Sequence, residues 1–203
     1  MLSLEDDFLQ SKDKNKLYAF VKKKLGGYRG IPDLQTNQGF ASTDRDKCEV
    51  FAQHFASVFT VDDGELPDFP SLTGSQLADP EITPAAVRAA IRSMAPKLSQ
   101  GPDHLPAYFF RQLYVPISYP LALLFEKSLQ EGTMPLIWRQ STVVPVFKKG
   151  TRAEPTNYRP IAKECVSLKV MEKVVMSSVV GHVEGLGLVS ESQFGFRAHR
   201  SVT

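Results

Sequence analysis

Apolar side chains in the first sixty or so residues recur at helical spacing in two places. The first pattern predicts a polar helix over roughly the first 27 residues, ended by Gly26 and Gly27, with its apolar positions at Leu17, Phe20, Val21 and Leu25. A clearer amphipathic helix is predicted after Thr43, whose side chain suits a helix N-terminus. Its apolar face comprises Cys48, Phe51, Ala52, Phe55, Val58 and Phe59. The intervening residues 28–42 are turn-rich, and Ile31 and Leu34 are expected to pack against a neighbouring element.

The second part of the chain predicts further helices. Thr83 and Pro84 suit the first positions of a helix whose apolar face comprises Val87, Ala90, Ile91 and Met94. Residues 106–131 predict two helices, broken near Pro116 or Pro120 and closed by Gly132. Residues 167–184 predict another, with Leu168, Met171, Val175 and Val179 aligned and Gly185 and Gly187 behind it.

One segment has strand composition. Residues 141–149 read STVVPVFKK, and Pro145 in the middle places this strand at a sheet edge or a bulge. The final QFGFRAHRSVT shows no periodicity. The sequence therefore predicts an α+β protein, mostly helical with a short β element. Residues 62–80, acidic and rich in Pro, Gly and Ser, are the best internal linker, which divides the chain into 1–61, 62–80 and 81–203.

Composition and motifs exclude several classes of protein. Hydrophobic residues make up 42% and charged residues 23% of 203 residues, enough to bury a core. No apolar run approaches a membrane span, and the acidic N-terminus does not resemble a secretory signal. Cys48 and Cys165 lack zinc-site spacing, so reduced thiols in an intracellular protein, nuclear or cytoplasmic, are expected. HExxH, GxSxG, GxGxxG and P-loop motifs are absent, and His54 is interpreted as structural.

The net charge of +2 conceals an asymmetry. Residues 1–103 carry 12 Lys/Arg and 15 Asp/Glu, a net charge of −3, whereas residues 104–203 carry 12 and 7, a net charge of +5. Six of the basic residues fall between Arg139 and Lys163, where Glu154 is the one acidic residue. Such an excess suits a polyanionic partner, and a solvated surface loop is the alternative.

Five irregular segments between residues 97 and 200 resemble, in order, those of one enzyme family. The segments are KLSQGPDHLPAYFF, STVVPVFKKG, PTNYRPIA, SLKVMEKVV and ESQFGFRAHRS. They are similar to the reverse transcriptase of non-LTR (LINE-type) retrotransposons, with its KSPGPDGIPxEFL-like entry, VVPIFKKG strand, NYRPI loop, KVxEK helix and QFGFRxGRST segment. Upstream, KLYAFVKKK, IPDLQTNQGF and KCEVFAQHFASVF resemble the helical linker region that precedes the polymerase domain, which implies that role for residues 1–61.

The resemblance implies that residues 81–203 form the fingers subdomain of a right-hand polymerase and an incomplete palm. Lys148, Lys149 and Arg159 would then bind the triphosphate of the incoming deoxynucleotide. A guanidinium makes paired hydrogen bonds to phosphate oxygens, whereas an ammonium acts as a point charge. The residues that would border the template strand are Phe194, Gly195, Phe196 and Arg197. For Arg197, a structural ion pair is the alternative. His104 stands where the family usually has glycine, which questions the turn geometry if the position needs a positive φ.

The resemblance also implies partners and a missing part. The full-length family enzyme would need an RNA template, a DNA primer and two Mg²⁺ ions held by palm carboxylates in an F-x-D strand and a Tyr-x-Asp-Asp turn. No Tyr-x-Asp-Asp occurs here and the last 60 residues contain no Asp. Both motifs are therefore expected beyond Thr203, and this span alone is expected to hold no metal or other cofactor and to be inactive.

Two other functions stay open at this point. One is a non-catalytic nucleic-acid-binding module, and the other is a non-functional retroelement relic. Without a palm, apolar side chains at Leu168, Met171, Val175 and Phe194–Phe196 are expected to be exposed and to favour self-association.

Overall fold

The computed structural model describes residues 30–37, 39–65, 74–190, 192–195 and 197. The helix predicted over the first 27 residues lies outside these ranges. Contacts group the chain into two compact units, one formed by residues 1–61 with 145–160 and the other by residues 62–144 with 161–203. They are unit 1 and unit 2, respectively. The three-part division expected from the sequence stays a prediction.

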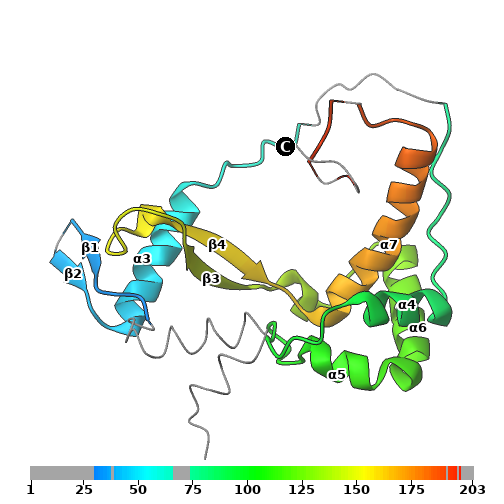
Figure 1. Ribbon diagram of the computed structural model, residues 1–203, viewed down its shortest axis with the longest axis horizontal. Helices are drawn as coiled ribbons and strands as arrows, with labels where there is room; N and C mark the ends of the chain where they lie inside the picture. The colour runs from blue at the N-terminus through cyan, green and yellow to red at the C-terminus, as the bar shows by residue number, and fades with distance from the viewer. Residues whose placement is uncertain (1–29, 38, 66–73, 191, 196, 198–203) are drawn as a thin grey trace, which may run out of the picture. The chain divides into compact units, whose positions relative to one another are not determined.

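The described residues are mostly helical, with short strands (Figure 1). The α-helices are α3 (Asp44–Ser57), α4 (Pro84–Ser93), α5 (Ala107–Gln112), α6 (Tyr114–Glu131) and α7 (Val166–Gly185). The strands are β1 (Leu34–Thr36), β2 (Gly39–Ala41), β3 (Thr142–Phe147) and β4 (Tyr158–Lys163), and two 3-10 turns are η1 (Leu136–Arg139) and η2 (Pro155–Asn157). The four strands form two sheets of two strands each, β1–β2 and β3–β4. The mixed, mostly helical α+β class predicted from the sequence is confirmed.

Unit 1 packs a β-hairpin against α3. Strands β1 and β2 are antiparallel, with Leu34 opposite Ala41. The Thr43 side chain accepts a hydrogen bond from the amide of Asp46, which confirms the predicted N-cap of α3. The buried core is aromatic and aliphatic, comprising Leu34, Ala41, Phe51, Phe55 and Tyr158. The expected packing of Leu34 is confirmed, since its side chain is fully buried.

The buried face of α3 is narrower than the sequence predicts. Cys48 and Ala52 are exposed, and Val58 and Phe59 lie beyond the end of the helix, also exposed. Lys47 is buried instead. Its Nζ donates to the carbonyl oxygen of Ile31 at 3.0 Å and lies 3.3 Å from the Asp33 carboxylate. The ammonium group therefore has polar partners although the rest of the side chain is buried. The spacing of apolar residues does not predict a buried lysine at this position.

Unit 2 is built from α4, α5, α6 and α7, which Figure 1 shows grouped together. The Thr83 side chain accepts a hydrogen bond from the amide of Ala86, and Pro84 occupies the first turn of α4, as predicted. The core contains Val87, Ala90, Ile91, Ala107, Phe110, Ala122, Phe125, Trp138, Cys165, Val166, Leu168, Val170, Met171 and Val174. Gly132 closes α6 in the left-handed conformation, with φ 60°, as its position predicts.

The break between α5 and α6 falls at Leu113, so the prediction of a break near Pro116 or Pro120 is wrong. Pro116 lies in the first turn of α6, where a backbone N–H has no partner within the helix and none is lost. Pro120 lies inside α6, which continues past it to Glu131. Proline there removes one backbone hydrogen bond without ending the helix, because the packed face of α6 carries Ala122 and Phe125 into the core.

Two further expectations are corrected near β4 and α7. The NYRPI segment is not a loop, since Tyr158–Lys163 forms strand β4 paired with β3. The predicted α7 is confirmed, but Leu168 and Met171 are buried in the unit 2 core rather than exposed, because α4 covers this part of the helix. Val175 is half-buried, and Phe194 is exposed as expected.

Pro145 lies in β3, an edge strand of its two-stranded sheet, as predicted. None of the helices in the described ranges is long and apolar enough to cross a bilayer.

Candidate functional site

The segment that joins β3 to β4 carries Lys148 and Lys149 and is braced at its base. The backbone N–H of Lys148 donates to the carbonyl oxygen of Asn157 at 2.8 Å. The Asn157 side-chain amide donates to the carbonyl of Thr151 at 2.9 Å and to the Glu154 carboxylate at 3.1 Å. Asn157 thus ties together three parts of the connection, which fixes the path of the chain just after the two lysines.

Gly150 allows this connection to close on Asn157. Its φ is +85°, which side-chain-bearing residues rarely adopt, and a Cβ there would lie 2.8 Å from the Asn157 side-chain nitrogen. Glycine directly after Lys149 therefore satisfies both the backbone conformation and the close approach of the amide.

Tyr158 anchors the other end of the connection in the unit 1 core. Its hydroxyl donates to the carbonyl oxygen of Arg152 at 2.7 Å, and burial raises the pKa of that hydroxyl. Its ring packs edge-on against Phe51 at 4.9 Å and against Phe147 at 5.5 Å between ring centroids. The Arg152 guanidinium lies 4.6 Å from the centroid of the Phe147 ring. Aromatic packing thus holds both strand ends beside the connection.

The three side chains expected to bind triphosphate, Lys148, Lys149 and Arg159, are all exposed in unit 1. Strand alternation explains Arg159, since its neighbour Tyr158 points into the core and adjacent strand side chains point to opposite faces. Among the described residues, none of the three cations lies within 4.0 Å of a carboxylate. Three exposed cations on a braced connection, with no carboxylate partner in the described part of the chain, suit a bound anion.

The residues expected to border a template lie in unit 2, beyond α7. Phe194 and Gly195 are exposed, and Phe196 lies outside the described residues. The Arg197 guanidinium contacts the Glu184 carboxylate twice, through Nε at 3.2 Å and through an Nη at 3.0 Å. It also donates to the carbonyl of Ser190 at 3.3 Å. Arg197 thus makes the structural ion pair that was the alternative for this residue, and a phosphate would have to compete with Glu184.

The GPD turn, by contrast, is an internal packing point of unit 2. Gly101 is buried against the peptide that precedes α7, and a Cβ there would collide with the Glu164 carbonyl and lie 2.8 Å from the Cys165 nitrogen. The amide of His104 donates to the carbonyl of Gly101 at 3.1 Å, and His104 has a φ of 57°. The position that carries glycine in the family therefore does have a positive φ here. Sequence reasoning singled out the turn but gave no signal for the contact with residues 164–165.

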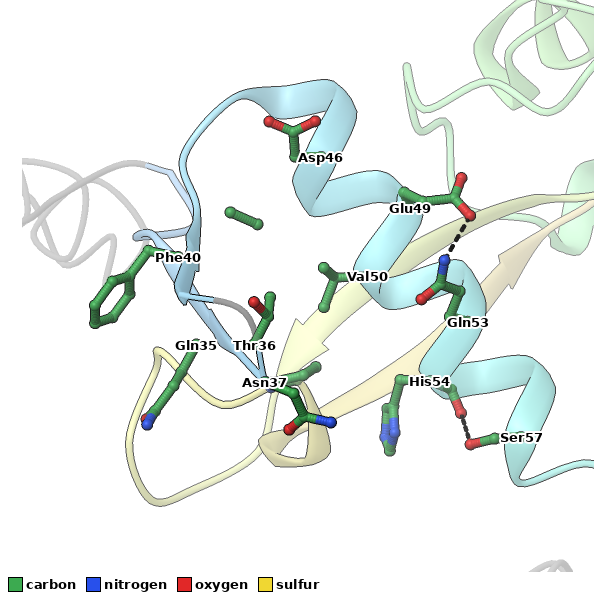
Figure 2. A pocket seen from close by; sticks show the side chains of 12 residues that line it. Gln35, Thr36, Asn37, Phe40, Asp46, Glu49, Val50, Gln53, His54 and Ser57 are labelled. Atoms are coloured by element: carbon green, nitrogen blue, oxygen red, sulfur yellow. Dashed lines mark hydrogen bonds between the residues drawn. The ribbon is translucent and has the colours of Figure 1, made fainter.

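A large groove of about 800 Å³ lies in unit 1 between α3 and the β1–β2 hairpin. Figure 2 shows Val50 and His54 on α3 and Thr36 and Asn37 on the hairpin around it. Glu49 and Gln53 are hydrogen-bonded to each other at 2.9 Å, and the Ser57 hydroxyl donates to the backbone of His54 at 2.8 Å. The ring of His54 tilts against Phe55 at 5.6 Å between centroids. The Glu49, Gln53 and Ser57 side chains are thus hydrogen-bonded within α3, and the Ser57 hydroxyl donates to backbone rather than to the His54 imidazole.

Metal-ligating side chains do not cluster in the described part of the chain. Among residues 30–37, 39–65, 74–190, 192–195 and 197, no group of three or more His, Cys, Asp or Glu side chains is placed to hold a metal ion. Cys165 is fully buried, its Sγ lies 3.5 Å from the carbonyl oxygen of Ile137, and burial raises the pKa of its thiol.

Comparison with known proteins gives consistent relatives. The chain is 27% identical over 168 residues to the "RNA-directed DNA polymerase from mobile element jockey" of Drosophila funebris, covering 78% of this chain. It is 27% identical over 179 residues to the "Probable RNA-directed DNA polymerase from transposon X-element" of Drosophila melanogaster, covering 84% of this chain. It is 24% identical over 188 residues to the "Probable RNA-directed DNA polymerase from transposon BS" of the same fly, covering 86%. This chain resembles retrotransposon RNA-directed DNA polymerases.

The similarity confirms the resemblance drawn from the five sequence segments. No protein-family model matches the chain. The aligned region spans 18% of the jockey polymerase of Drosophila funebris and 20% of the X-element and BS polymerases, about a fifth of each. The chain is thus related to a limited portion of these much longer proteins.

Proposed function

We propose that this chain is a substrate-binding portion of a non-LTR retrotransposon reverse transcriptase. In this proposal the β3–β4 connection presents Lys148, Lys149 and Arg159 to the phosphates of a deoxynucleoside triphosphate or of a primer–template duplex. The observation that carries it is the exposure of three cations without carboxylate partners among the described residues, on a connection braced by Asn157 and Tyr158. The similarity to RNA-directed DNA polymerases supports the choice of ligand.

The proposed role is binding rather than the chemical step. Phosphoryl transfer depends mainly on positioning and on neutralising charge, and this set of side chains supplies positive charge. A guanidinium at Arg159 would engage two phosphate oxygens at once, and the two adjacent ammonium groups would add point charges. The described residues contain no carboxylate cluster for Mg²⁺, which full-length relatives are expected to need, so no metal-dependent step is assigned to them.

A binding experiment on the 203-residue chain tests this proposal. The probe is a fluorescein-labelled RNA–DNA duplex, and its affinity is measured by anisotropy between about 50 and 200 mM salt. Replacing Lys148, Lys149 and Arg159 together with alanine should weaken binding and make the slope of log K against log salt shallower by about 3 units, one for each phosphate that is no longer neutralised.

A charge-matched control removes three exposed cations elsewhere, Arg45, Arg92 and Lys127. This variant loses the same net charge, so it separates a local site from general attraction. Equal loss of affinity in both triple variants, or no loss in the first, contradicts the proposal. Competition by a deoxynucleoside triphosphate in the same assay distinguishes nucleotide binding from duplex binding.

A further inference from the structure

A second cationic site lies in unit 2 and shares no residue with the site of the proposed function. A cavity of about 320 Å³ opens between the segment after α4, the end of β4 and the first turns of α7. Four lysines line it, namely Lys97, Lys163, Lys169 and Lys173, and its one acidic lining residue is Glu164. These lysines come from three separate segments, so the fold and not a run of basic sequence gathers them.

The four ammonium groups have no carboxylate within 4.0 Å among the described residues. Two other cations of unit 2 are ion-paired, since Lys127 lies 3.7 Å from Glu131 and Arg197 lies 3.0 Å from Glu184. Two further carboxyl groups lie near the lining without belonging to it, namely Asp103, which interacts with the Cys165 thiol, and Glu172 on α7. Burial, and then the Glu164 carboxylate, raise the pKa of Glu172, while Lys169 opposes that shift. The lining itself thus holds four ammonium groups and one carboxyl group, and adding Asp103 and Glu172 still leaves an excess of positive charge.

The cavity has a fixed wall. Gly101 lies against the Glu164–Cys165 peptide so closely that a Cβ would overlap it, at 2.6 Å from the Glu164 carbonyl carbon. The amide of Tyr108 donates to the carbonyl of Lys97 at 3.1 Å, which ties the segment bearing that lysine to α5. Lys163 and Lys169 are half-buried beside this contact, so their charges are partly removed from water. Repulsion among partly desolvated like charges is relieved when an anion binds.

We propose that this cavity is a phosphate-binding site, which accepts one phosphate group, either of a nucleic-acid strand or free in solution. A volume of about 320 Å³ is roughly ten times the share of one water molecule in the liquid, enough for a phosphate group and part of its hydration shell. Lysine ammonium groups from several directions suit a phosphate, which presents acceptor oxygens on all sides. The site contains none of Lys148, Lys149 and Arg159, so it stands or fails separately from the proposed function.

Lysine reactivity tests the proposal on the unmodified chain. The full chain is treated briefly with an acetylating reagent, alone, with a short single-stranded RNA, or with inorganic phosphate, and acetylation of each lysine is quantified by peptide mass spectrometry. The RNA should slow acetylation of Lys97, Lys163, Lys169 and Lys173 at least threefold and leave Lys127 unchanged. Protection by inorganic phosphate as well identifies a site for free phosphate, whereas protection by RNA alone identifies a strand contact.

Two outcomes overturn the proposal. One is equal acetylation of the four lysines with and without both probes. The other is protection of Lys148 and Lys149 alone, which leaves the proposed function intact while this site fails. As a second measurement, Lys169→Gln with Lys173→Gln should weaken RNA binding at least threefold, whereas Lys127→Gln should not. The fluorescence of Trp138, buried in unit 2, verifies that each variant is folded.

Discussion

His104 occupies a backbone conformation that suits glycine. Its φ of 57° places it in the left-handed region, where a Cβ crowds the following carbonyl oxygen. The side chain is exposed, and the amide of Leu105 donates to the Asp103 carboxylate at 3.2 Å, so the turn is held by its neighbours rather than by the imidazole. The strain is local, and substitution at this one residue can measure it.

Replacing His104 with glycine should therefore stabilise the chain. A side chain in the left-handed region costs about 1–2 kcal/mol, and glycine loses part of that gain because it makes the unfolded chain more flexible. We expect the free energy of unfolding to rise by about 0.5–1 kcal/mol, measured by urea denaturation followed through Trp138 fluorescence. His104→Ala keeps the Cβ and should give no such gain. A lower stability for the glycine variant would mean that the imidazole itself supports the turn.

Gly101 should show the opposite sensitivity, because here the limit is space rather than φ. A Cβ at Gly101 would overlap the backbone of Glu164 and Cys165, and backbone cannot rotate away as a side chain can. Gly101→Ala should lower the free energy of unfolding by about 1–3 kcal/mol, the usual cost of overpacking. Gly181→Ala is the matched control, since Gly181 lies within α7 with open space around its Cβ position. There alanine should stabilise by about 0.5–1 kcal/mol. Effects of the same sign at both glycines would contradict the packing argument.

At the scale of elements, local signals predicted the helices well. The Thr83–Pro84 start of α4 and the Gly132 stop of α6 were predicted correctly because they depend on side chains adjacent in sequence. Strands β1, β2 and β4 were missed. Two are three residues long, and β4 is defined by pairing with β3 rather than by its own alternation. The break at Leu113 was misplaced because proline in the first turn of a helix is harmless.

Candidate site residues, too, were predicted where the signal is local in sequence and missed where the fold brings distant segments together. Lys148, Lys149 and Arg159 came from an ordered set of motifs, a signal that is visible in one sequence. The four-lysine cavity was not predicted, because Lys97 is distant in sequence from Lys163, Lys169 and Lys173 and the Gly101 contact brings their segments together. The buried Lys47 was missed for a similar reason, since its partners Ile31 and Asp33 precede the hairpin and lie outside α3.

One tyrosine hydroxyl adds to the hydrogen bonds that hold the β3–β4 connection. Tyr158→Phe removes the hydrogen bond to the Arg152 carbonyl while leaving the ring packed against Phe51 and Phe147. We expect a loss of about 0.5–1.5 kcal/mol in the free energy of unfolding and faster hydrogen exchange in the connection. Urea denaturation and exchange by mass spectrometry measure the two effects. Tyr119→Phe, at an exposed position on α6, should change neither. An unchanged exchange rate in the Tyr158 variant would show that Asn157 alone fixes the connection.

At the scale of the whole molecule, the described residues form two hydrophobic cores with no residue in common. The unit 1 core centres on Phe51, Phe55 and Tyr158, and the unit 2 core on Phe125, Ile91 and Val170. The described residues 30–61 and the 145–160 segment are distant in sequence, yet they belong to one unit. Because each core is buried by its own helices, a cavity made in one core should destabilise that unit first.

Hydrogen exchange on two core variants tests whether the units unfold separately. Phe51→Ala should cost unit 1 about 3–5 kcal/mol and raise exchange in α3, while amides of α4 and α7 keep their protection. Ile91→Ala should cost unit 2 about 2–5 kcal/mol and raise exchange in α4 and α7 but not in α3. Trp138, the one tryptophan of the sequence, lies in the unit 2 core, so its fluorescence midpoint should move only in the second variant.

The result bears on how each site can be studied. If both variants raise exchange throughout the described helices, the chain unfolds as one cooperative body, and a mutation in either core disturbs both the β3–β4 connection and the four-lysine cavity. If exchange rises only in the unit that carries the substitution, the two phosphate-binding proposals concern independently stable parts. Phe51→Ala would then impair the binding that depends on Lys148, Lys149 and Arg159 while leaving acetylation protection in the four-lysine cavity intact. The loss of one binding activity without the other is expected because Phe51 and Ile91 are buried in different cores.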